Sequence, residues 1–190
     1  MIDFLPPSNQ KFKNLSGVFS AAPYQNFIIK RLIAQFKYEP YVKGLAKTLA
    51  SLIIHNIQQT ENHLLKVVPR SDLGTAFIVP IPLTKKRLKQ RGFNQSEEIA
   101  KELAKFLEIP LANNILLKVK ETRAQVELSG KDREENLKGV FAVRNNDLIK
   151  NKNILLVDDV FTTGSTLKEA ASVLKVAGAK QIWGITVARE

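Results

Sequence analysis

One stretch constrains this chain more than any other, residues 153–174, which read NILLVDDVFTTGSTLKEAASVL. The apolar run ILLV predicts a buried strand, and two carboxylates, Asp158 and Asp159, follow it directly. A turn with four hydroxyl side chains around Gly164 comes next, and apolar residues then recur at helical spacing. A strand, a polar turn and a helix in this order indicate a parallel sheet that binds ligands at the carboxyl ends of its strands.

The sequence around this stretch alternates strands and helices. From residue 76 onward we predict strands over 76–82, 153–158 and 181–188, helices over 94–107 and 165–178, and two weaker strands over 114–120 and 139–143. Asn94 or Ser96 would cap the first of these helices. The fold class is therefore α/β, a mostly parallel sheet flanked by helices.

The N-terminal part of the chain has a different pattern. Apolar residues at helical spacing predict helices over 24–38 and 41–57, separated by Pro40, and a short strand over 17–21 precedes them. We therefore expect a small N-terminal helical lobe over residues 1–60 and an α/β core over residues 61–190.

Composition excludes several classes of function. The chain has no cysteine, which rules out disulfides, thiolate catalysis and cysteine-bound zinc. His55 and His63 lie in a polar stretch, where solvated side chains are expected rather than a metal site or a Ser-His-Asp triad. No apolar run is long enough to cross a bilayer, and the N-terminus does not look like a signal peptide, so we expect a cytoplasmic protein without membrane insertion.

The net charge of +11 favours polyanionic partners such as nucleic acid, an anionic membrane surface or a phosphorylated small molecule. A general excess that only aids solubility is the alternative.

The turn after the acid pair has the chemistry of a phosphate site. Gly164 lets the backbone approach a ligand closely, and the N-terminus of the following helix favours an anion. Four hydroxyls can donate to phosphate oxygens, those of Thr162, Thr163, Ser165 and Thr166. The two acids cannot bind that same phosphate, so they must face vicinal hydroxyls or a divalent cation. A ribose 5-phosphate satisfies both halves of the motif.

Other interpretations explain less. Thr166 and Glu169 have the spacing of a capping box, but a helix cap would not require the acid pair or the other hydroxyls. The acidic strand is also typical of P-loop ATPases, yet the sequence contains no G-x-x-x-x-G-K-[ST] motif. It contains no G-x-G-x-x-G either, so nicotinamide or flavin binding is unsupported.

Several motifs resemble one known family. The stretch ILLVDDVFTTGST at 154–166 closely resembles the signature with which type I phosphoribosyltransferases hold phosphoribosyl pyrophosphate. The chain as a whole resembles the ComF family, competence-associated proteins built on that fold. This second resemblance rests on VPIPLTKKRLKQRGFNQSEEIAKEL at 79–103, TRAQVELSGKDREENLKGVF at 122–141 and IIKRLIAQFKY at 28–38. These motifs cover most of the chain from about residue 24.

The resemblance implies a ligand and a role for each part of the signature. The ligand would be 5-phosphoribosyl 1-pyrophosphate with Mg2+ as cofactor. Asp158 and Asp159 would contact the ribose hydroxyls, influence the magnesium ion and contribute to catalysis. The 5-phosphate would be held by Thr162, Thr163, Gly164, Ser165 and Thr166.

By the same resemblance, residues 81–84 and the cations after them occupy the place of the family's pyrophosphate loop. The expected ligand contacts there are Pro82, Leu83, Lys85, Lys86 and Arg87. Three cations beside a strand end would suit a diphosphate on chemical grounds as well, with arginine bidentate and lysine a point charge. The alternative is a solvated basic helix face.

Segment 122–135 stands where these enzymes carry a flexible hood over the reacting centre, with Gly130 as a possible hinge. Its ligand-facing residues would be Arg123, Gln125 and Arg133, with Arg123 expected to take part in catalysis.

The chain departs from the family pattern at two places. Many ComF proteins begin with a cysteine-rich zinc segment, which cannot form without cysteine. Purine-transferring relatives have an acid where this chain has Thr162, so a general base is missing there and a purine acceptor is disfavoured.

Two classes of function follow. The first is an enzyme that transfers the phosphoribosyl group to an unknown nitrogen acceptor, mostly by positioning and electrostatic stabilisation. The second is a non-catalytic protein of natural transformation that handles single-stranded DNA, works with the DNA-uptake machinery and retains the phosphoribosyl pyrophosphate site. For that role Phe93 beside Arg91 could offer a stacking surface, although a core position suits this aromatic better. A purely metabolic role is a third possibility, and the oligomeric state stays open.

Overall fold

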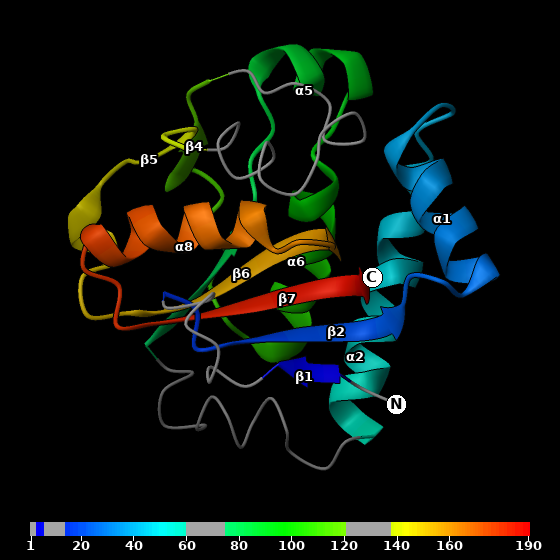
Figure 1. The fold of residues 1–190 in the computed structure, drawn as a ribbon, viewed down its shortest axis with the longest axis horizontal. Helices are drawn as coiled ribbons and strands as arrows, with labels where there is room; N and C mark the ends of the chain where they lie inside the picture. Colours follow the sequence, from blue (N-terminus) through cyan, green and yellow to red (C-terminus); the bar gives the residue numbers. More distant parts are fainter. Residues whose placement is uncertain (1–2, 6–13, 60–74, 121–137) are drawn as a thin grey trace.

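A five-stranded sheet lies at the centre of the molecule (Figure 1). The computed structural model describes residues 14–59, 75–120 and 138–190, and the backbone of residues 3–5. The strand order is β1-β2-β7-β6-β3, in which β2, β7, β6 and β3 run parallel and β1 pairs antiparallel with β2. The strands span β1 Asp3–Leu5, β2 Gly17–Pro23, β3 Ala76–Pro80, β6 Asn153–Phe161 and β7 Gln181–Arg189. The predicted α/β class with a mostly parallel sheet is confirmed.

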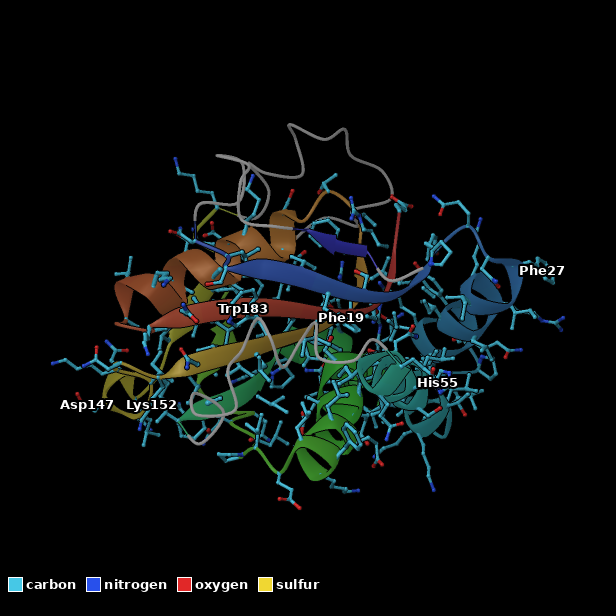
Figure 2. The ribbon with its side chains drawn as sticks, turned by 90° about the horizontal axis from the view of Figure 1, so that it is seen from below. Phe19, Phe27, His55, Asp147, Lys152 and Trp183 are labelled. Carbon is cyan, nitrogen blue, oxygen red and sulfur yellow. The ribbon has the colours of Figure 1, made fainter. Side chains whose placement is uncertain are left out.

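Helices cover both faces of this sheet (Figure 2). Helices α2 and α6 pack on one face, where Leu49 and Leu103 share a buried cluster with Leu155 of β6. Helix α8 packs on the other face, where Leu174 is buried with Ile154. The helices span α1 Phe27–Lys37, α2 Leu45–Gln59, α5 Lys85–Arg91, α6 Gln95–Leu107 and α8 Ser165–Val176, with a short 3-10 helix η3 at Asn146–Leu148. None of the helices in these described ranges is both long and apolar enough to cross a membrane.

The two weaker predicted strands form a separate unit. Strands β4, Leu116–Lys118, and β5, Phe141–Val143, pair antiparallel in a two-stranded sheet of their own. The chain between them, 121–137, lies outside the described residues.

The N-terminal residues form the expected helices α1 and α2 and also contribute to the central sheet. The strand predicted over 17–21 is β2, which pairs in parallel with β7. Helix α1 begins after Asn26, whose side chain accepts hydrogen bonds from the N–H groups of Ile28 and Ile29. The proposed domain boundary at residue 60 lies outside the described residues.

The structure shows whether two side chains discussed above, those of His55 and Phe93, are exposed or buried. His55 is exposed on α2, as expected of a solvated histidine (Figure 2), whereas His63 lies outside the described residues. Phe93 is only 8% exposed and its ring lies 5.5 Å from that of Phe36. Because Phe93 is a core residue, the idea that it stacks on DNA bases is wrong.

Candidate functional site

A pocket opens at the carboxyl end of β6, where the strand turns into α8. It is lined by most of the residues that the sequence singled out, namely Pro82, Leu83, Arg87, Asp158, Asp159, Thr162, Thr163, Gly164, Ser165 and Thr166. It is also lined by polar residues that were not predicted to contact a ligand, namely Lys37, Arg91, Gln95, Ser96 and Lys118. The acid pair and the hydroxyl-bearing turn therefore face one common space.

The turn between β6 and α8 is arranged as an anion site requires. Gly164 has a left-handed backbone with φ of 75°, a conformation that other residues rarely adopt, and α8 begins at the next residue. The hydroxyl oxygens of Thr163 and Ser165 lie 2.7 Å apart, so these side chains are held together at the N-terminus of the helix. Backbone N–H groups of a first helical turn and fixed hydroxyls both donate to anionic oxygen atoms.

The capping-box interpretation of this turn is wrong. Helix α8 already begins at Ser165, so Thr166 lies within its first turn rather than at the cap. The Glu169 carboxylate accepts a hydrogen bond of 2.7 Å from the N–H of Gly139, in the chain leading to β5, instead of reaching back to the helix start. The hydroxyls thus need another explanation, and the pocket in front of them supplies one.

The acid pair lies within β6 rather than beyond its end. The predicted strand over 153–158 continues to Phe161, because β7 offers hydrogen-bonding partners as far as Arg189. Asp158 accepts hydrogen bonds from the Ser96 hydroxyl at 3.0 Å and from the N–H of Asp159 at 2.9 Å. Burial, and then the charge of Asp159, raise the pKa of Asp158 to about 6.

Asp159 is the more enclosed of the two acids. Its side chain is 8% exposed, and one carboxylate oxygen lies 2.9 Å from the ammonium of Lys37, the last residue of α1. Burial disfavours the charged form of Lys37, but the attraction of Asp159 and Asp158 outweighs it and raises the pKa of Lys37. This lysine was not among the site residues predicted from the sequence. Its only signal was its place at the end of the N-terminal motif.

Some basic side chains of helix α5 line the pocket and others face solvent. The Thr84 hydroxyl caps it by accepting a hydrogen bond from the N–H of Arg87. Arg87 and Arg91 line the pocket, whereas Lys85 and Lys86 are exposed and do not. The structure thus places one of the three predicted cations in the pocket and adds Arg91. The expected hood residues Arg123, Gln125 and Arg133 lie outside the described residues.

The carboxylates of Asp158 and Asp159 could bind Mg2+ only together with oxygen atoms from a ligand or water. The described residues contain no group of three or more histidine or acidic side chains that could hold a metal ion. Asp158 and Asp159 offer two carboxylates in the pocket that the hydroxyl-bearing turn also lines, and Mg2+ is commonly bound by one or two carboxylates together with water and substrate phosphates. The site therefore suits a magnesium ion that arrives with its ligand.

The sequence is similar to a known family of domains and to several known proteins. The family model of the phosphoribosyl transferase domain matches residues 92–190. Competence protein F of Haemophilus influenzae is 38% identical over 159 residues, which cover 81% of this chain and 66% of the relative. Competence protein ComFC of Streptococcus pneumoniae is 37% identical over 60% of this chain and 47% of its own length.

A third relative, DNA utilization protein YhgH of Escherichia coli, is 35% identical over 56% of this chain. The alignment covers 47% of YhgH, so the chain matches between about half and two thirds of the length of these relatives. The family model spans more than half of the 190 residues and includes the acid pair and the hydroxyl-bearing turn. The chain therefore belongs to the ComF family of proteins with a phosphoribosyltransferase domain.

Proposed function

We propose that this protein binds 5-phosphoribosyl 1-pyrophosphate together with Mg2+ and transfers the phosphoribosyl group to a nitrogen acceptor. The observation that carries the proposal is the shared pocket, in which Asp158 and Asp159 lie next to the turn 162–166. Acids that accept from a diol, beside donors that hold a phosphate, match the two ends of a ribose 5-phosphate.

Each wall of the pocket has a part in this scheme. The hydroxyls and N–H groups of the turn hold the 5-phosphate, while the acid pair accepts hydrogen bonds from the two ribose hydroxyls. Arg87 and Arg91 also line the pocket, and their guanidinium groups would bind the diphosphate. Bound Mg2+, held by Asp158 and Asp159 and the ligand's own oxygens, would neutralise charge on the diphosphate.

The reaction is a substitution at the first carbon of the ribose. A nitrogen atom of the acceptor forms a bond to that carbon, and the carbon–oxygen bond to the diphosphate breaks. The diphosphate leaves with the electron pair, and the acceptor nitrogen gives its proton to water. Since the leaving group is already stable, the protein mainly positions the reactants and stabilises the departing charge.

Calorimetric titration of 5-phosphoribosyl 1-pyrophosphate in the presence of Mg2+ tests the binding. The double variant Asp158→Asn/Asp159→Asn should lose at least about 100-fold in affinity, because hydrogen bonds to charged acceptors contribute about 1.5–3 kcal/mol each. Glu102→Gln on α6, away from the pocket, is the matched control and should bind normally. Unchanged binding by the double variant would show that the acids are not part of the site.

Release of pyrophosphate with a panel of nitrogen acceptors tests the transfer itself. At least one acceptor should release pyrophosphate with the unaltered protein and none with the double variant. Tight binding without release across the whole panel would favour the non-catalytic role.

A second candidate function, the handling of single-stranded DNA, rests on the outer side of α5. Lys85, Lys86 and Lys89 are exposed there and do not line the pocket, and the chain is strongly basic overall. The names of the relatives, a competence protein and a DNA utilization protein, favour the same idea. Exposed lysines that follow a phosphate backbone give affinity without sequence preference.

This candidate predicts a steep loss of affinity for single-stranded DNA as the salt concentration rises. Lysine side chains that neutralise DNA phosphates release the counterions of the DNA, and this release becomes less favourable in high salt. Lys85→Glu/Lys86→Glu should weaken binding, whereas Lys47→Glu on the exposed side of α2 should have a smaller effect. Fluorescence anisotropy with a labelled oligonucleotide provides the measurement. Binding that is absent or independent of salt would remove this candidate.

A further inference from the structure

The acid pair receives a cation from a part of the chain that the family model does not match. Lys37 ends α1, and its ammonium lies 2.9 Å from Asp159, 122 positions later in the sequence. The family model begins only at residue 92. In Figure 1, α1 stands beside the carboxyl ends of β7 and β2. Its last residue, Lys37, lines the pocket.

A buried network fixes the end of α1 at this point. Gln95, 1% exposed at the start of α6, donates a hydrogen bond of 3.0 Å to the backbone carbonyl of Phe36. Gln95 in turn accepts a hydrogen bond from Arg91, and the Phe36 ring packs against Phe93. The backbone next to Lys37 is therefore tied to the helix that carries the Asp158 partner Ser96.

The two acids are consequently held by different partners. Asp158 accepts hydrogen bonds from the Ser96 hydroxyl and from a backbone N–H, whereas within the described part of the chain the Asp159 side chain is oriented by its contact with Lys37. An enclosed carboxylate without its cation would be repelled by the neighbouring acid and would turn away from it or take up a proton. Lys37 lines the pocket and its side chain is 30% exposed, so the pair borders the ligand space directly.

We propose that Lys37 is a positioning residue that holds the Asp159 carboxylate in the orientation needed to accept hydrogen bonds from the sugar hydroxyls. The inference rests on the proposed function, because it assigns the ligand's diol to the acid pair. The proposal gives α1, through its last residue Lys37, a role in ligand binding. A purely structural ion pair that ties α1 to the sheet is the competing explanation.

Calorimetric titration with two small ligands separates these explanations. Ribose 5-phosphate probes the whole subsite, and inorganic phosphate probes the turn alone. Lys37→Met should weaken ribose 5-phosphate binding about as much as Asp159→Asn, by about tenfold for one charged contact. Both variants should bind inorganic phosphate as the unaltered protein does, and Lys37→Arg should restore most of the ribose 5-phosphate affinity.

The double variant Lys37→Met/Asp159→Asn provides the decisive comparison. If Lys37 acts through Asp159, the double variant should bind ribose 5-phosphate no more weakly than Asp159→Asn alone. Lys30→Met, on the exposed side of the same helix, is the matched control and should bind both ligands normally. Thermal unfolding of each variant identifies any general loss of structure.

Two results would overturn the inference. The first is normal ribose 5-phosphate binding by Lys37→Met, and the second is losses in the two single variants that add in the double variant. Failure of the proposed function gives a different result, in which the unaltered protein binds neither ribose 5-phosphate nor 5-phosphoribosyl 1-pyrophosphate.

Discussion

Asp158 has a proposed role in ligand binding, but its surroundings disfavour the ionised carboxylate. Its carboxyl is enclosed beside a second carboxylate, and its pKa is raised from 3.8 to about 6 by burial first and by Asp159 second. A charge that is costly in the folded protein and still present near neutral pH is typical of functional sites rather than of structural ones. The residue should therefore reduce stability while it supports ligand binding.

The variant Asp158→Asn tests whether the ionised Asp158 carboxylate reduces the stability of the fold. The raised pKa means that the folded protein binds the proton more tightly, so this group makes the free energy of unfolding fall as pH rises from about 4 to about 6. The variant lacks that fall, and above pH 6 it should be more stable than the unaltered protein by roughly 3 kcal/mol, because each unit of the pKa shift corresponds to about 1.4 kcal/mol. The amide oxygen of asparagine can still accept from Ser96.

Urea unfolding of both proteins between pH 4 and pH 8 provides the measurement. The two free energies should nearly coincide at pH 4 and separate by pH 7. A variant that is less stable at pH 7 would show that the ionised carboxylate stabilises the fold.

At the scale of single elements, the segment RGFNQS at 91–96 connects much of the site. Gly92 ends α5 in a left-handed conformation, and Asn94 caps α6 and donates a hydrogen bond to the carbonyl of Ile81. Gln95 donates to Phe36 of α1, and Ser96 donates to Asp158 of β6. Six consecutive residues thus join the helices around the pocket to the sheet.

The sequence predicted the local part of this arrangement and not the rest. The cap at Asn94 follows from residue type and helix periodicity, which are properties of neighbouring residues. The partners of Gln95 and Ser96 lie 59 and 62 positions away in the sequence, and no local pattern encodes them. A polar residue near a helix start looks the same whether it faces solvent or a distant strand.

Gln95→Leu tests the connection between α6 and α1. Loss of the amide leaves the buried carbonyl of Phe36 without its donor and should cost about 1–3 kcal/mol in the free energy of unfolding. Gln90→Leu, at an exposed position of α5, is the control and should change stability by no more than about 0.5 kcal/mol. Urea unfolding measures both, and equal effects of the two substitutions would contradict the assigned contact.

At the scale of the whole molecule, strand and helix periodicity predicted the sheet and its covering helices because burial repeats along each element. The same periodicity predicted α1, but not that its last residue would reach the acid pair. That contact depends on how α1 packs beside the sheet, which is a property of the assembled fold. Similarly, the extension of β6 to Phe161 depends on the length of β7.

Gly184 of β7 tests how closely the layers pack. A Cβ atom there would lie 2.9 Å from the Leu167 side chain of α8 and 3.2 Å from the Val18 side chain of β2, so the buried Leu167 must shift to admit a methyl group. Gly184→Ala should therefore lower the free energy of unfolding by about 1–3 kcal/mol. Because Leu167 also lines the pocket, its displacement should weaken phosphate binding at the turn.

Gly44→Ala is the matched control, since a Cβ atom at that position meets nothing within 4 Å. It should leave stability unchanged or raise it by about 0.4–1 kcal/mol, because alanine restricts the unfolded chain. Thermal and urea unfolding of both variants test the pair. A Gly184→Ala variant as stable as Gly44→Ala would mean that α8 can move away from the sheet at little cost.

A crystal structure of the protein with ribose 5-phosphate tests whether a single pocket binds both ends of this ligand. We predict that the phosphate lies against the turn 162–166 and that the two ring hydroxyls lie within hydrogen-bonding distance of Asp158 and Asp159. A ligand bound elsewhere, or one whose phosphate lies beside Arg87 while the turn contacts protein or water alone, would contradict the proposed binding site.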